Sequence, residues 1–284
     1  MSTPMNEAPA ATGIEGAASP APLLSFFLAH HFLIWQFAKK DVLARYRGSV
    51  LGLLWSILNP LGMLAAYTLV FGFILKSRSG FGASGNLDFA LLLYAGLVAH
   101  GLVSDCITRS PMLIAAQPNL VKKVVFPLEL LPVSSLAANL FQSAINLAIL
   151  LVFHALLAPE WSWHALLSPV ALLCLVPFLL GAVWMLSAFG VFVRDIAQVM
   201  ALASSLLLFL SPVFYPVTLV PEPWRAALYL NPLTPAIENL RRMLFAHEMP
   251  HWGELALLFA AGCVFAWIGL VLFRRMRPGF ADVV

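Results

Sequence analysis

Residues 165–193 read ALLSPVALLCLVPFLLGAVWMLSAFGVFV and contain no Asp, Glu, Lys or Arg. About 20 consecutive apolar residues are enough for a helix to cross the hydrocarbon core of a bilayer. Because that core offers no water to the backbone, a segment inside it must pair its own amide groups, as a helix does. This stretch therefore predicts a membrane-spanning helix and places the fold in a membrane.

The rest of the chain has the same character. Of its 284 residues, 61% are hydrophobic and 10% are charged, whereas soluble domains carry about 25% charged residues. So few charges cannot cover a soluble globule, which excludes a soluble enzyme, a disordered chain and a nucleic-acid binder. The apolar runs are continuous, which also argues against an outer-membrane barrel with its alternating strands.

Further apolar runs accompany the first, so we predict an all-α integral membrane protein with six transmembrane helices. The expected spans cover residues 50–75, 87–108, 128–157, 165–193, 197–217 and 253–273. If the N-terminus is cytoplasmic, eleven Lys and Arg residues lie inside and five lie outside. The positive-inside rule then predicts a multi-pass protein with both termini in the cytoplasm.

The N-terminal region has two parts before the first span. Residues 1–22 are rich in Ala, Pro, Ser and Gly and predict a disordered tail. In residues 23–47, Leu28, Phe32 and Trp35 begin an apolar helical stripe, and most of the charges lie off it. This pattern predicts an amphipathic helix that lies in the membrane interface.

The connection between spans five and six is broken repeatedly by proline. Residues 212–252 hold two short helical candidates, at about 223–230 and 235–247. Irregular backbone at membrane depth is tolerated where it packs against protein or lines a cavity. We therefore predict a re-entrant helical hairpin that covers another part of the protein or a cavity. The transmembrane domain then covers residues 23–278, and residues 279–284 form a C-terminal tail.

Catalytic signatures are missing from the sequence. It has no GxxxxGK[ST] loop, so we expect no ATP or other cofactor to be bound by this chain. It has no HExxH or GxSxG motif either. Cys106, Cys174 and Cys263 lie far apart without metal-ligand spacing, so we expect no metal site. The sequence indicates a transport pathway, or one part of a larger machine, and no catalyst.

Three blocks of sequence carry a more specific signal. They are RYRGSVLGLLW at 45–55 with NPL at 59–61, NLVKKVVFPLELLP at 119–132, and LNPLTP at 230–235 followed by ENLR at 238–241. In this order and topology the chain resembles the ABC-2 family of ABC-transporter permeases. It resembles most closely the polysaccharide-export branch, which includes the O-antigen, teichoic-acid and capsule exporters. The resemblance covers about residues 24–278.

That resemblance implies a homodimer bound to two copies of a separate P-loop ATPase, which would hold ATP and Mg. The dimer would enclose a channel, lined by spans one and five, for an undecaprenyl-type lipid-linked polysaccharide crossing the bacterial inner membrane. The interface helix and a cytoplasmic elbow at 109–127 would contact the ATPase. The residues assigned to this coupling contact are Arg45, Tyr46, Arg47, Arg109, Asn119, Lys122 and Lys123.

Aromatic rings that stack on sugar faces while keeping polar edges wet would line the path. The candidates are Trp55, Tyr67, Phe71, Tyr94, Phe209, Phe214 and Tyr215. The hairpin would gate the outer end, with Glu238, Arg241 and Arg242 at a rim that meets the glycan or an anionic lipid headgroup. Simpler interpretations compete: membrane topology for the basic residues, packing for the aromatics, and an exposed ion pair worth roughly 0.3–0.5 kcal/mol for the rim.

Other functions remain open on the sequence. One is an ABC-2 exporter of drugs or other small molecules, whose ATPase would be stimulated by small amphiphiles. Another is an integral membrane glycosyltransferase or acyltransferase, which needs a cluster of acids or His that this sequence does not display. A third is a passive membrane scaffold, which would tolerate replacement of Asn59, Pro60 and the elbow.

Overall fold

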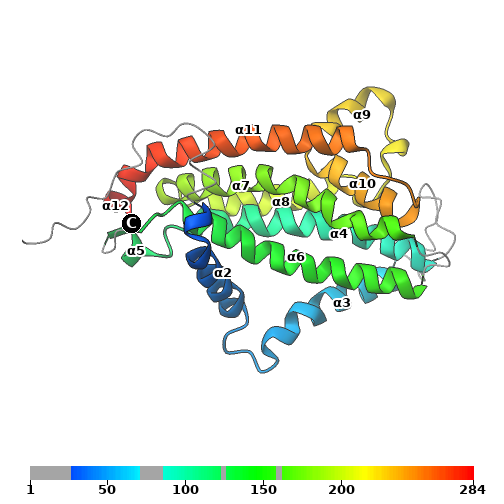
Figure 1. The fold of residues 1–284 in the computed structure, drawn as a ribbon, viewed down its shortest axis with the longest axis horizontal. Helices are drawn as coiled ribbons and strands as arrows, with labels where there is room; N and C mark the ends of the chain where they lie inside the picture. Colours follow the sequence, from blue (N-terminus) through cyan, green and yellow to red (C-terminus); the bar gives the residue numbers. More distant parts are fainter. Residues whose placement is uncertain (1–26, 71–85, 123–125, 158–161) are drawn as a thin grey trace, which may run out of the picture.

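The computed structural model describes residues 27–70, 86–122, 126–157 and 162–284, and every regular element among them is a helix (Figure 1). Long helices run side by side as a bundle, while α3 and α8 are shorter (Figure 1). Their bounds are α3 (Trp55–Tyr67), α4 (Asn86–Arg109), α6 (Leu130–Leu157), α7 (Ser168–Phe192), α8 (Ile196–Leu210) and α11 (Trp252–Met276). The prediction of an all-helical membrane fold is confirmed.

Short elements connect the long ones and gather at the two ends of the bundle (Figure 1). Near one end lie α2 (His31–Arg45), η3 (Ser110–Met112), α5 (Pro118–Lys122), η6 (Arg277–Gly279) and α12 (Phe280–Val283). Near the other end lie η4 (Trp163–Leu167), η5 (Val217–Leu219), α9 (Glu222–Tyr229) and α10 (Leu233–Phe245). A further turn, η1 (Gly52–Leu54), leads into α3.

Five of the described helices are long and apolar enough to cross a membrane: Gly52–Val70, Phe89–Met112, Leu130–Leu157, Trp163–Phe192 and Trp252–Val283. The fifth expected span is shorter than predicted, because α8 has 15 residues and ends at Leu210 instead of Val217. Ser211 has extended backbone, with ψ at 153°, since the residue before a proline avoids the helical region. The count of six spans stays a prediction.

Helix α4 forms the centre of the bundle. Leu91, Leu93, Ala95 and Ala99 are each at most 1% exposed, and α4 packs against α6, α7, α8 and α10. The surrounding helices keep large apolar side chains on their outer faces, such as Leu206 of α8. Exposed apolar faces of this extent suit a lipid or protein surrounding and not water.

Helices α7 and α11 make the closest pairing, and small residues permit it. A Cβ atom on Gly269 would lie 2.5 Å from the Gly181 carbonyl oxygen, and one on Gly262 would lie 2.8 Å from the Phe178 nitrogen. Phe178 and Phe265 stack across the same interface at 4.6 Å. Glycine at such positions lets two membrane helices approach backbone to backbone.

The N-terminal helix differs in one respect from the amphipathic pattern expected of residues 23–47. The stripe residues Phe32 and Trp35 are exposed, at 62% and 66%. Other sides of the helix are apolar as well: Ala38 is buried, and the ring centroids of Phe37 and Phe126 lie 5.1 Å apart. Helix α2 therefore has an apolar surface on more than one side, and it packs against α6.

Candidate functional site

A cavity of about 540 Å³, which we call the central groove, lies between α3, α4 and α6. It is reached by side chains from the end of α2. Its lining combines aromatic rings, amides and charged groups, including Arg45, Tyr46, Trp55, Asn59, Tyr67, Tyr94, His100, Asp105, Arg109, Gln142 and Asn146. The structure thus brings together three of the predicted aromatic path residues and three of the predicted coupling residues.

The α3 wall of the groove contains a proline inside the helix. Pro60 has no N–H, so the carbonyl of Ser56, four residues earlier, loses its helical donor. Gln142 of α6 donates its side-chain Nε2 to that Ser56 oxygen at 3.0 Å. The freed backbone group is paired across the helix interface, and Gln142 fixes α3 against α6 at the groove wall.

Gln142 also receives the C-terminal end of α2. The Tyr46 hydroxyl donates to Gln142 Oε1 at 2.9 Å, and Arg45 donates to Asn139 one turn away on α6. Burial lowers the pKa of Arg45, and nearby Arg109 adds to the effect. Two residues predicted to touch an ATPase are therefore directed at the chain's own α6, while Arg47 is exposed.

The α4 wall carries two polar groups in an apolar setting. Tyr94 is 4% exposed, lines the groove and has a buried hydroxyl without a hydrogen-bond partner among the described residues. Six residues further along α4, Nε2 of His100 lies 3.0 Å from the backbone carbonyl oxygen of Ser204 on α8. The Ser204 hydroxyl donates to the Ser104 hydroxyl at 2.6 Å. These contacts join α4 to α8 beside the groove.

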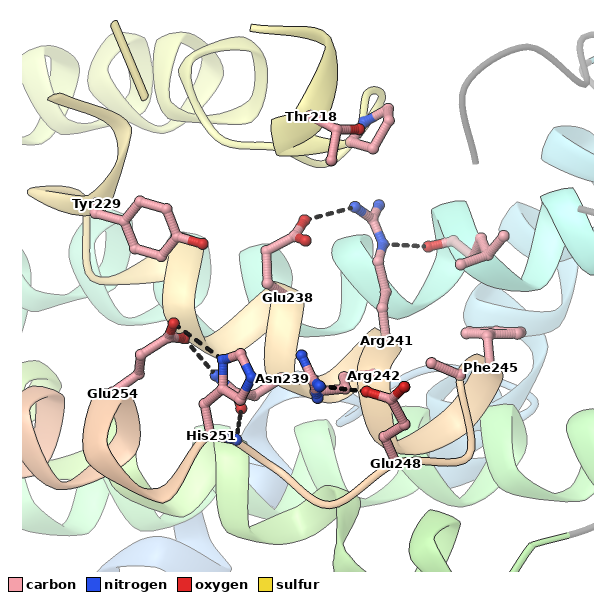
Figure 2. A pocket seen from close by; sticks show the side chains of 13 residues that line it. Thr218, Tyr229, Glu238, Asn239, Arg241, Arg242, Phe245, Glu248, His251 and Glu254 are labelled. Carbon is pink, nitrogen blue, oxygen red and sulfur yellow. Dashed lines mark hydrogen bonds and ion pairs between the residues drawn. The ribbon is translucent and has the colours of Figure 1, made fainter. Parts of the chain in front are cut away.

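A second cavity, about 390 Å³ in volume, lies at the α9–α10 end of the bundle (Figure 2). We call it the hairpin cleft. Its walls are α10, the start of α11 and residues near α9. Most of the residues that line it have polar side chains; these are Thr218, Tyr229, Glu238, Asn239, Arg241, Arg242, Glu248, His251 and Glu254.

Arg241 fastens α10 to α4 and to the turn that follows α8. Its guanidinium donates to the carbonyls of Leu92 at 3.1 Å and of Pro212 and Val213 at 2.6 Å each. Glu238 is its ion-pair partner at 3.6 Å. Burial lowers the pKa of Arg241 to about 10, which leaves it charged at neutral pH.

The rest of the cleft is held by side chains pairing with one another (Figure 2). Asn239 donates to Glu254 at 3.0 Å and accepts from the His251 backbone N–H at 2.6 Å. Arg242 pairs with Glu248 and donates to the Met249 carbonyl. Burial raises the pKa of Glu238 more than Arg241 lowers it.

The elbow expected at 109–127 is partly described. Asn119 and Lys122 are exposed on α5, and Arg109 lies 3.9 Å from Asp105. Lys123 lies outside the described residues. Two residues after the elbow, the buried carboxylate of Glu129 accepts a hydrogen bond from Arg277 at 2.9 Å and lies 3.8 Å from Arg274. These contacts join the end of the elbow to the C-terminal part of the chain.

The remaining path candidates are located elsewhere. Phe209 and Phe214 lie at the end of α8 with tilted rings whose centroids are 5.9 Å apart, and the Tyr215 hydroxyl donates to the Phe209 carbonyl at 3.3 Å. These three do not line the central groove. Phe71 lies outside the described residues.

Comparison with known proteins decides the family. Residues 33–245, three quarters of the chain, match the pattern of the ABC-2 type transporter family. The chain belongs to that family. The match extends from α2 to the end of α10, so it includes both the central groove and the cleft residues of α10.

Curated relatives of this ABC-2 chain are similar along almost their whole length. The O-antigen export system permease protein RfbA of Myxococcus xanthus is 27% identical over 89% of this chain and 95% of its own. A protein of the same name from Klebsiella pneumoniae is 25% identical with the same coverage. The polysialic acid transport protein KpsM of Escherichia coli is 23% identical over 83% of this chain and 90% of its own.

Two residues of this ABC-2 chain gain importance only in the structure: Gln142 and Glu129. A sequence signal for the first was present, because Asn139, Gln142 and Asn146 lie three and four residues apart on a mostly apolar span. Polar residues inside a membrane helix are expensive and face partners. The partners of Glu129 could not be read from the sequence, since Arg274 and Arg277 follow 145 and 148 residues later.

Proposed function

We propose that this chain is the membrane-spanning permease subunit of an ATP-driven exporter that moves a lipid-linked polysaccharide, such as O-antigen, across the bacterial inner membrane. The observation that carries the proposal is the end-to-end similarity to permeases named for O-antigen export. The lining of the central groove supports it. Sugars present hydroxyls and apolar C–H faces, which polar side chains and aromatic rings accommodate.

The proposed topology has six spans, with α8 as the fifth, and both termini in the cytoplasm. The bias of eleven basic residues to five supports this orientation. Residues 23–278 form the transmembrane domain between the tails 1–22 and 279–284. The segment 212–252, with α9 and α10, then lies at the outer end as a re-entrant gate hairpin.

The working assembly is proposed to be a homodimer with two copies of a P-loop ATPase, and ATP and Mg bind only in those partner subunits. Large exposed apolar side chains on α3 and α8, among them Met63 and Leu202, offer a face for the second copy. A second copy over this face would enclose the central groove as a channel. Aromatic rings at the end of α8 would extend its lining.

Coupling is proposed to run from the ATPase through α2 and the elbow. ATP-driven closure of the partners would displace the end of α2, which holds α6 and α3 through Tyr46 and Gln142. Movement of α3 against α6 would change the width of the groove. The α9–α10 hairpin would then open, and the glycan would move outward stepwise.

Two measurements test this function. The tagged chain, extracted in mild detergent, should co-purify with a P-loop ATPase in equal copy number. Cells carrying Trp55→Ala with Tyr67→Ala should accumulate lipid-linked polysaccharide inside, while Trp267→Ala, an exposed tryptophan on α11 outside the groove, should not. Full export by cells lacking the chain would refute the proposal, and stimulation of the ATPase by small amphiphiles would favour a small-molecule exporter.

The coupling contact has its own test. Arg47 and Lys122 are exposed, and their side chains make no hydrogen bond or ion pair among the described residues. Alanine at both positions should therefore leave the permease folded. Export should fall while the ATPase still hydrolyses ATP. Undiminished export with both replaced would show that the ATPase docks elsewhere.

A further inference from the structure

The hairpin cleft has a different chemistry from the anionic-lipid rim considered from the sequence. Both arginines of that rim are occupied: Arg241 by three backbone carbonyls and Arg242 by Glu248 and the Met249 carbonyl. Arg241 is 6% exposed, and the charge of Arg242 is already balanced by Glu248. An anionic headgroup would instead meet the carboxylates of Glu238 and Glu254.

What the cleft does offer is acceptor capacity next to an aromatic ring. Glu254 accepts one bond from Asn239 and lies 3.1 Å from His251 Nδ1, yet each carboxylate oxygen can take a second donor. Glu238 also lines the cleft; its Oε1 is buried against Arg241, while its side chain is 30% exposed. Tyr229 is 43% exposed, and its ring and the two carboxylates converge on the same part of the cleft (Figure 2).

Size and rigidity also fit a small ligand. The cleft volume of about 390 Å³ falls in the range of roughly 300–1,000 Å³ found for ligand sites. Asn239, 1% exposed, holds Glu254 and the His251 backbone in place. The polar groups are therefore positioned before any ligand arrives, which lowers the entropic cost of binding.

We infer that the hairpin cleft binds one uncharged sugar unit of the glycan as it leaves the hairpin, with Glu238 and Glu254 accepting from its hydroxyls and Tyr229 covering its C–H face. The inference rests on the proposed export function and adds a site that is separate from the central groove. It also gives the site a selectivity: a neutral sugar should bind better than a uronic acid of the same size.

The test uses the purified full-length permease in detergent and saturation-transfer NMR. The probes are methyl α-mannoside, N-acetylglucosamine, glucuronic acid and ethanolamine. The neutral sugars should show transfer and glucuronic acid should show less. Tyr229→Ala should lower the affinity about fivefold, the usual value of one aromatic contact, and Glu254→Gln should lower it as well.

The matched control is Trp224→Ala, which removes another exposed aromatic of α9 that does not line the cleft. It should leave sugar binding unchanged. Sugar binding that is absent, or equal in wild type and both cleft variants, would overturn the inference, as would stronger transfer to ethanolamine or glucuronic acid. Failure of the export function itself is distinguishable, because it is measured by polysaccharide retention in cells that lack the chain.

Discussion

Arg241→Met is the substitution that should damage this fold most specifically. Methionine retains an unbranched apolar chain of similar reach but donates no hydrogen bond. The Leu92 carbonyl still belongs to the α4 helical ladder, whereas the Pro212 and Val213 carbonyls lie just after α8 and accept their hydrogen bonds from Arg241. The variant should therefore leave two buried acceptors unpaired.

The expected loss of folding free energy follows from these two unpaired acceptors. An unsatisfied buried group costs about 1–3 kcal/mol, and removing one partner of a buried charged network costs about 3–5 kcal/mol. Part of this loss is offset because the variant no longer has to bury a charged guanidinium, which in the wild type belongs to a residue only 6% exposed. We expect a net loss of about 3 kcal/mol, or a fall in Tm of roughly 6–12 °C at about 2–4 °C per kcal/mol.

Tryptophan fluorescence of the detergent-solubilised protein during heating gives the Tm, and hydrogen exchange of the non-proline residues within 211–216 reports the local opening. Arg242→Met is the matched control, because its side chain is 34% exposed and pairs with Glu248 on the surface. Such a pair is worth at most about 1 kcal/mol. If Arg241→Met and Arg242→Met cost the same, or the 211–216 amides stay protected, Arg241 does not hold the hairpin as described.

Three further substitutions address other contacts. Gly96→Ala should lower Tm and increase exchange near Val213, because its Cβ would lie 3.0 Å from the Arg241 guanidinium and 3.1 Å from the Val213 Cα. Glu129→Gln should loosen the contact between the elbow and the C-terminal end of the chain, seen as faster proteolysis near residue 277. If Glu129 made only a surface ion pair, its replacement would leave the proteolysis rate unchanged. Burial raises the pKa of Glu238 above its ordinary 4.5, so ionisation of this carboxyl opposes folding. The stabilising contribution of the protonated carboxyl is present below pH 4.5 and is lost as pH rises through the raised pKa. Glu238→Gln removes this titration, so the Tm of the variant should fall less than that of the wild type as pH rises above 4.5.

The sequence predicted those features that depend on local chemistry. Long apolar runs fixed most spans to within a few residues, and prolines at 223 and 235 located α9 and α10. The error at the fifth span has a local cause too. Ser211-Pro212 ends α8 at Leu210, whereas composition alone extends the run to Val217.

Long-range contacts could not be predicted in the same way. Arg241 and Arg242 are neighbours in sequence and look equivalent beside Glu238, but they point about 100° apart on a helix. One reaches carbonyls of α4 and of the turn after α8, and the other reaches the surface. Only the packing of α10 against α4, with Gly96 leaving space, decides which is buried.

The two proline breaks have one physical solution in common. Pro60 frees the Ser56 carbonyl, which Gln142 pairs, and the break at Pro212 leaves carbonyls that Arg241 pairs. In both cases a side chain from another helix replaces a backbone donor, as a low-dielectric surrounding requires. The first break lies in the wall of the central groove and the second anchors the hairpin cleft. At these two points the backbone depends on a single neighbouring side chain, so substitutions there test the path and the hairpin separately.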